Sequence, residues 1–310
     1  MGFLYIRQCK NLYNMERKDT MGLLDKEKER LKNHYNKLST ENKSIKKETE
    51  NSLKTLTKIE IEVAKTLISF AEIYIKIGCS PDFYEMDGFG DKKVNLNIDD
   101  LKSQSRRITF ISENISENDS RAYAAVSLIG TKKLLEVSDS LGINDSKVEA
   151  EQIDDLKAKL NGFSSDILDK DLIDNNLKID SEKAEGIFDC EKTLHKAIGD
   201  FKDINSDLNS IKSNTDIYSE KLKYLMKIYE EYKEIVREYI DFTRVKNWKD
   251  LDKNQDALMA IHTNIAVAQT LHDMISIGVY DSGIKEMKKM IERADEVINV
   301  IEVYLKVNIF

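Results

Sequence analysis

Acidic and amide side chains alternate from Asp250 to Asp256, in the run DLDKNQD. Oxygen ligands at alternate positions are typical of the beginning of a calcium-binding loop. Such a loop also needs a glycine for its sharp turn and a bidentate acid at its twelfth position, where this chain has Gln255 and Ile261. We therefore predict no metal site here and interpret Asp250 or Asp252 as the cap of the helix that follows.

Other residues that could bind metal are equally unpromising. Asp87 and Asp91 lie among glycines in EMDGFGDKK, a composition that predicts a turn. The chain has no HExxH motif. We expect a surface or helix-interface position for each of the four histidines, His34, His195, His262 and His272.

Nucleophiles and phosphate-binding loops are not indicated either. The sequence contains no GxSxG, no GxxxxGK[ST] and no GxGxxG. Cys9, Cys79 and Cys190 are far apart, odd in number and without a CxxC pattern, which fits a reducing cytosol. We therefore predict no catalytic, cofactor-binding or metal-binding residue, no cofactor, and a protein that is not an enzyme.

The composition favours long helices. Charged residues make up 34% of the 310 residues, with one proline and twelve glycines. The hydrophobic share of 41% suits a thin rod with much surface. A net charge of −8, with both signs interleaved, argues against nucleic acid or an anionic membrane as the main partner, because binding to either requires clustered Lys and Arg.

The strongest pattern is an apolar seam from Ile187 to Thr243, whose positions step by three and four as in a heptad repeat. A helix of that span is about 85 Å long and must pack against other long helices. Four tyrosines occupy seam positions, Tyr218, Tyr229, Tyr232 and Tyr239. We interpret them as core packing rather than as a platform for stacked bases.

Similar periodicity predicts helices along the rest of the chain, with breaks at Gly130, Gly142 and Gly162. The chain is predicted to begin with a long helix (21–78), followed by a loop (79–105) and a set of shorter helices (106–183). A very long helix (184–246), a further helix (252–278) and a last helix (284–306) complete the predicted order. Short loops between long helices favour antiparallel packing. The sequence thus predicts an all-α fold, a single elongated antiparallel bundle over residues 21–310 with coiled-coil packing.

Residues 1–20, MGFLYIRQCKNLYNMERKDT, show no steady helical period. Glu16, Arg17 and Lys18 can be encoded by purine-rich codons that act as a ribosome-binding site ahead of Met21. We hypothesise that residues 1–20 are a mis-assigned extension and that the native chain begins at Met21 rather than at Met1.

Three segments carry a resemblance: MGLLDKEKERLKNHYNKL, the seam over 187–243, and the run that begins NWKDLDKNQDALMAIHTN. Over residues 21–75 and 185–305 the chain resembles uncharacterised bacterial long-helix proteins with an MGLL-type start. Those relatives carry an apolar hairpin rich in glycine and alanine, and this chain has the short AYAAVSLIG after Arg121. More remotely, the chain is similar to the cytolysin A-type α-helical pore-forming toxins, which implies long helices and a central apolar element.

These observations lead to two functional hypotheses. The first is a cytoplasmic, non-enzymatic helical protein that acts through protein–protein contacts, with a protein partner or by self-association. The alternative, implied by the toxin resemblance, is a membrane-active protein. No window of about 18 apolar residues exists to span a membrane, and we interpret the apolar stretch 257–272 as a buried helix.

Overall fold

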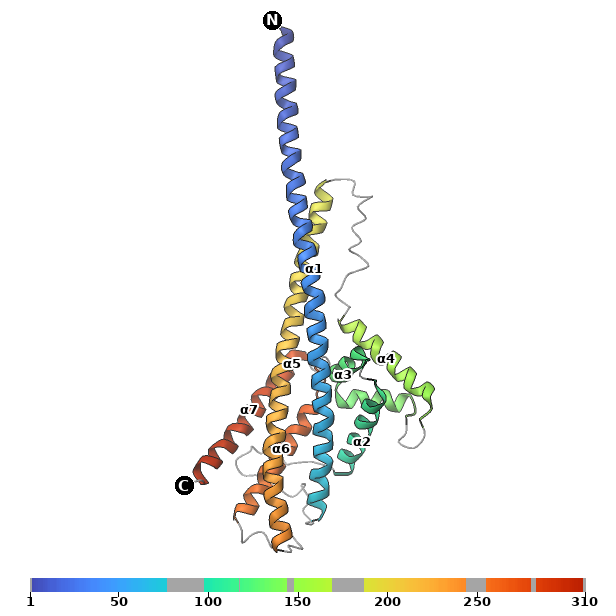
Figure 1. Ribbon diagram of the computed structural model, residues 1–310, viewed down its shortest axis with the longest axis vertical. Helices are drawn as coiled ribbons and strands as arrows, with labels where there is room; N and C mark the ends of the chain where they lie inside the picture. Colours follow the sequence, from blue (N-terminus) through green and yellow to red (C-terminus); the bar gives the residue numbers. More distant parts are fainter. Residues whose placement is uncertain are drawn as a thin grey trace. The chain divides into compact units, whose positions relative to one another are not determined.

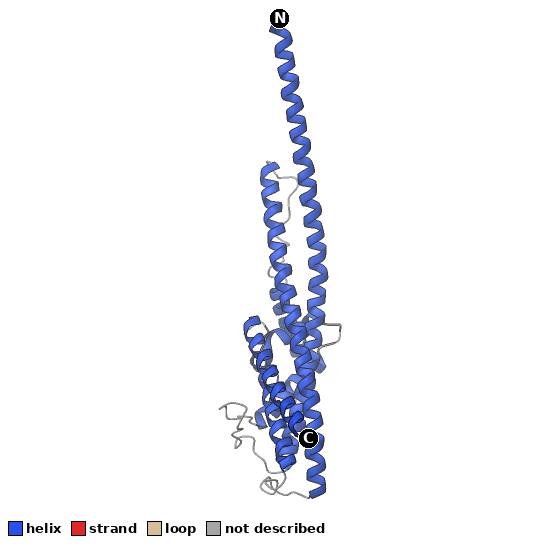
Figure 2. Cartoon of the chain, turned by 90° about the vertical axis from the view of Figure 1, so that its left-hand side faces the viewer, coloured by secondary structure: helices blue, strands red, loops and turns tan. Residues whose placement is uncertain are grey.

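The computed structural model of the chain describes residues 2–76, 98–116, 118–143, 148–168, 187–243, 255–279 and 283–308. Within these ranges every regular element is an α-helix and no residue lies in a strand (Figure 2). The helices are α1 (Gly2–Lys76), α2 (Ile98–Asn114), α3 (Ser120–Ser140), α4 (Ala150–Leu168), α5 (Ile187–Thr243), α6 (Gln255–Ile275) and α7 (Gly283–Asn308). The predicted all-α fold class is confirmed.

Several predicted boundaries differ from the observed ones. Helix α2 begins at Ile98, inside the loop expected over 79–105, and α1 begins at Gly2, inside the segment without a steady period. Gly162 does not break α4, because glycine lowers helix stability by only about 1 kcal/mol. Gly142 ends α3 as expected: its φ is 66°, and Ile143 N donates to Ser138 O at 3.0 Å, as in a Schellman cap.

Contacts between residues group the chain into two compact units, whereas the sequence led us to expect a single bundle over 21–310. Unit 1 comprises Met1–Glu48 and Ile167–Ser210, and unit 2 comprises Thr49–Asp166 and Ile211–Phe310. Helices α1 and α5 therefore each contribute one part to unit 1 and another to unit 2.

Unit 1 has a narrow core between α1 and α5. Tyr35 packs edge-on against Phe201, with ring centroids 5.3 Å apart. Asn42 Nδ2 donates to Asn205 Oδ1 at 2.8 Å, and both side chains are buried. The apolar members of this core are Leu31, Leu38, Leu194, Ile198 and Phe201.

Unit 2 has a much larger core. One part lies where α2, α3 and α4 meet, with Ile111, Leu134 and Leu156 among its buried side chains. The seam positions of α5 predicted from the sequence are buried in this unit at Tyr218, Leu222, Leu225, Tyr229, Tyr232 and Val236. Their burial confirms which face of α5 packs inward.

Helices α1 and α5 run parallel, because contacts advance together along both of them. In unit 1, Tyr35 meets Phe201 and, further on, Asn42 meets Asn205. The colours in Figure 1 show the same direction for both helices. The predicted antiparallel packing is wrong for this pair, since it assumed short connections, and α2, α3 and α4 lie between α1 and α5 along the chain.

Consecutive helices in the C-terminal part of unit 2 do alternate in direction. Tyr218 near the start of the α5 segment meets Met274 near the end of α6. Further along α5, Lys221 pairs with Asp295 of α7, and Tyr224 Oη donates to Glu302 Oε1 at 2.9 Å. Helix α6 is therefore antiparallel to α5, and α7 is parallel to α5.

Candidate functional site

The carboxyl group of Glu60 is buried inside unit 2, on the side of α1 that contacts α3. The residue is 8% exposed. Burial raises the pKa of this carboxyl well above 4.5, and the hydrogen bond with Ser127 offsets that rise only in part. Glu60 therefore keeps its proton to a higher pH than an exposed glutamate does.

Two hydroxyl groups connect α1 with α3 beside this acid. Ser127 Oγ lies 3.4 Å from Glu60 Oε2 and 3.0 Å from the carbonyl oxygen of Leu53. Thr57 Oγ1 contacts Ser127 Oγ and donates to the carbonyl oxygen of Tyr123 at 2.7 Å. These bonds satisfy polar groups that would otherwise be costly to bury.

A second group of polar side chains surrounds Asp273, between α6 and α7. Arg293 Nη1 lies 2.6 Å from Asp273 Oδ2, Gln269 Nε2 donates to Oδ1 at 2.9 Å, and His272 Nδ1 is 3.6 Å from Oδ1. Burial raises the pKa of Asp273, but His272, Arg293 and Gln269 outweigh it and hold the pKa below its ordinary value. Asp273 is thus an ionised, paired carboxylate.

The phenol of Tyr218 on α5 is buried in the same unit and feels the charges of both acids. Its hydroxyl donates to the carbonyl oxygen of Met274 at 2.9 Å. Burial, followed by the negative charges of Glu60 and Asp273, raises the pKa of the phenol well above 10. We call the set the polar cluster; its members are Thr57, Glu60, Ser127, Tyr218, Asp273 and Arg293.

The backbones of α3 and of the segment after α6 touch at two glycines. Gly130 kinks α3 with a φ of 67°, and a Cβ there would lie 2.3 Å from Gly278 N. A Cβ at Gly278 would lie 2.5 Å from the carbonyl carbon of Ile129. Val279 N donates to Ser127 O at 3.3 Å across the same contact. Side chains are excluded here, so the two backbones are held directly against each other.

The first half of α3 is buried on every side, from Ala122 to Thr131. This is the AYAAVSLIG stretch, and its small residues let α1 and the segment after α6 approach closely. Most of α6 is buried as well, which agrees with the predicted buried helix over 257–272. Among the described residues, no helix combines the length and apolar character that crossing a bilayer demands.

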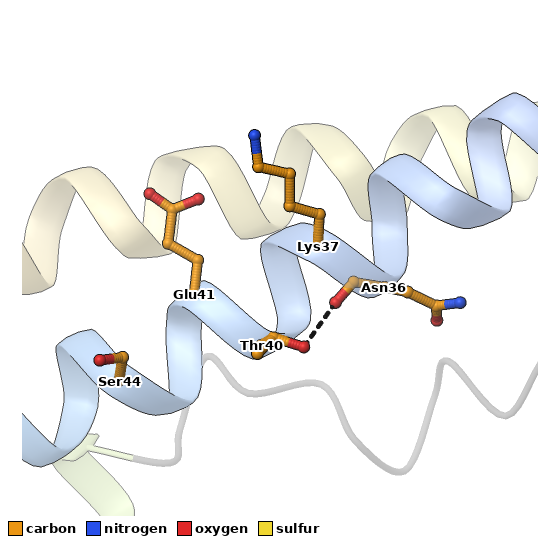
Figure 3. A pocket seen from close by; sticks show the side chains of 5 residues that line it. All are labelled: Asn36, Lys37, Thr40, Glu41 and Ser44. Carbon is orange, nitrogen blue, oxygen red and sulfur yellow. Dashed lines mark hydrogen bonds between the residues drawn. The ribbon is translucent and has the colours of Figure 1, made fainter.

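Two surface hollows contain no converging set of reactive groups. The first is lined by five side chains of α1 in unit 1, Asn36, Lys37, Thr40, Glu41 and Ser44 (Figure 3). The second lies at the start of α3, where Arg121 Nη1 already donates to Ser165 Oγ at 2.7 Å and Nε lies 3.8 Å from Glu50 Oε1.

The four histidines considered from the sequence lie on three different helices, α1, α5 and α6. His34 and His195 are exposed, whereas His262 and His272 are half-buried on α6. Cys79, Asp87, Asp91 and Asp250 lie outside the described residues. Among the described residues, no three His, Cys, Asp or Glu side chains gather as a metal site would require.

The sequence reasoning missed Glu60 because it followed apolar residues alone. The buried positions Leu53, Leu56, Glu60, Val63 and Leu67 step by three and four along α1. Glu60 therefore occupies a buried position of the repeat, and a search for apolar residues alone does not include it because it is charged. The spacing of its apolar neighbours along α1 is the signal in the sequence that predicts burial of Glu60.

Comparison of the chain with protein-family models, with curated proteins and with solved structures finds no match.

Proposed function

We propose that this chain is a non-enzymatic helical protein that acts in the cytoplasm through contacts with other protein surfaces. The observation that carries the proposal is a row of exposed apolar side chains on α5. Ile217, Tyr224 and Ile235 are 39%, 40% and 45% exposed, at spacings of about two and three helical turns. Val303 of α7, in the same unit, is 59% exposed.

The row contrasts with the charged side chains around it. Glu220 and Lys223 on α5 are exposed and polar, as a solvated helix face requires. Large apolar side chains that recur on one face of a helix are typical of surfaces that pack against another helix. We name the surface formed by Ile217, Tyr224 and Ile235 the α5 apolar row.

The test compares the wild-type chain with the double variant Ile217→Ser, Ile235→Ser and with the matched control Lys223→Ser, which removes an exposed polar side chain from another face of α5. Sedimentation equilibrium measures self-association, and cross-linking in cells followed by mass spectrometry identifies protein neighbours. We expect the double variant to lose self-association or neighbours that the wild type and the control retain.

One outcome of this comparison would contradict the proposal. If all three chains sediment as compact monomers and cross-link to the same neighbours, the α5 apolar row is not a contact surface and the proposal is wrong.

A second candidate is a membrane-active protein, and the observation in its favour is the all-round burial of the first half of α3. An apolar helix with no polar face is suited either to a protein core or to lipid. The resemblance to cytolysin A-type toxins supports the same candidate. Co-flotation with liposomes, with dye leakage read in the same sample, tests it. Absence of both binding and leakage would remove this candidate.

A further inference from the structure

The first half of α3 is packed in the apolar core that α2, α3 and α4 form in unit 2, and a few polar bonds and a tight backbone contact also join it to α1 and to the segment after α6. Thr57 and Ser127 supply the bonds on the side of α1, where Ser127 also reaches Glu60. Gly130 and Gly278 supply the contact on the other side. The kink at Gly130, with its φ of 67°, separates this first half from the rest of α3.

The charge that faces Ser127 is the carboxyl of Glu60, and no described basic side chain forms an ion pair with it. An ionised carboxylate in an apolar interior without a cation is strongly disfavoured. The neutral acid, by contrast, can be accommodated beside the two hydroxyl groups. The stability of the contact between α1 and α3 therefore depends on the proton of Glu60.

Other charged and titratable groups of the polar cluster and its surroundings come from each neighbouring helix. On α1, Lys54 Nζ lies 5.7 Å from the ring centroid of Tyr123 on α3. Tyr218 of α5 stays protonated, because burial raises its pKa well above 10. The remaining groups are Asp273 and His272 of α6 and Arg293 of α7, which interact among themselves.

We propose that Glu60 is a pH-sensitive latch for α3: its neutral carboxyl holds the buried half of α3 against α1, and its ionisation releases that half and exposes the AYAAVSLIG surface. The direction of the pH effect follows from the linkage between protonation of Glu60 and folding. A carboxyl that binds its proton more tightly in the folded state stabilises the fold fully below its unfolded-state pKa, near 4.5, and that stabilisation is lost as pH rises through the folded-state pKa. Release is therefore promoted by higher pH, not by acid.

Hydrogen exchange measured by mass spectrometry on the full-length chain tests the latch between about pH 5 and pH 9. Protection factors, corrected for intrinsic exchange, are followed for peptides of residues 120–130. We expect the protection in the wild type to fall by up to about tenfold per pH unit across the titration of Glu60. In the Glu60→Gln variant, which cannot ionise, the protection should stay constant.

Three controls separate the latch from other causes. Glu62→Gln removes an exposed acid two residues away on α1 and should behave as wild type. His272→Gln removes the imidazole beside Asp273 and should also behave as wild type. Ser127→Ala removes the hydrogen bond that lowers the pKa of Glu60, so the midpoint of release should move to higher pH.

Two outcomes would overturn the proposal. The first is the same pH profile for residues 120–130 in the wild type and in Glu60→Gln. The second is a parallel loss of protection in α7, over residues 283–308, because general loosening of unit 2 is not a latch on α3.

Discussion

Asn42 and Asn205 place an amide pair inside the narrow core of unit 1, where apolar side chains occupy the other seam positions. Asn42 Nδ2 is satisfied by the carbonyl of Asn205, but Nδ2 of Asn205 is buried without a partner. Such a pair contributes less to stability than to the choice of register between two helices, since a shifted register would leave both amides buried and unpaired.

Removing one amide of this pair is therefore predicted to lower the free energy of unfolding more than replacing both amides with apolar side chains. We expect Asn42→Ala to lower the free energy of unfolding by about 1–3 kcal/mol, and Asn42→Leu with Asn205→Leu to be near neutral or stabilising. Urea titration followed by circular dichroism measures both. Asn36→Ala, at an exposed position of α1, is the matched control. Additive losses from the two Leu substitutions would contradict the prediction.

The pair between Asp273 and Arg293 gives a prediction with a defined pH dependence. Because the folded-state pKa of Asp273 is lowered below 3.8, its contribution is present above that pH and is lost as pH falls through the folded-state value. We expect Arg293→Ala to lower the free energy of unfolding by about 1 kcal/mol at neutral pH. Urea titrations at about pH 7, 5 and 3 should show the deficit shrinking at the lowest pH.

At the scale of elements, glycine spacing alone could not distinguish a helix break from a helix interior. The sequence predicted breaks at Gly130, Gly142 and Gly162 alike. Gly130 and Gly142 adopt positive φ, whereas Gly162 lies inside α4, and a Cβ added there would have no atom within 4 Å. Whether a glycine breaks its helix depends on the neighbouring segment that packs against it, and a single sequence does not show which segment that is.

Alanine substitutions should therefore have opposite effects at two of these glycines. Gly130→Ala would require a Cβ 2.3 Å from Gly278 N at a strained φ, and we expect a loss of about 2 kcal/mol or more. Gly162→Ala should stabilise the chain by about 0.5–1 kcal/mol. Thermal unfolding measures both, and a neutral Gly130→Ala would show that the two backbones can separate at little cost.

At the scale of the whole molecule, periodicity predicted the long helices and the buried face of α5, but not the division into units or the parallel course of α1 and α5. A seam repeat specifies which side of a helix is buried and is the same for either direction of the partner. The direction is determined by the connection, and the connection from α1 to α5 includes three helices, α2, α3 and α4.

The two units should also differ in stability, because unit 1 has the smaller apolar core. We predict faster hydrogen exchange in residues 26–48 and 192–210 than in residues 49–70 and 211–236 of the same two helices. The comparison within α1 and within α5 controls for helix length and composition. Equal protection along each helix would contradict the prediction.

The parallel pairing of α1 with α5 has a consequence for synthesis on the ribosome. Asn42 meets a partner 163 residues further along the chain, so α1 leaves the exit tunnel long before α5 exists. At translation rates of about 5–20 residues per second, the part of α1 that belongs to unit 1 must wait roughly 8–30 s with its seam uncovered. Asn42, Thr49 and Glu60 interrupt the seam of α1 with polar groups. Because burying an unpaired polar group is unfavourable, we expect these residues to weaken the attraction between nascent α1 segments on neighbouring ribosomes before the native partner is made.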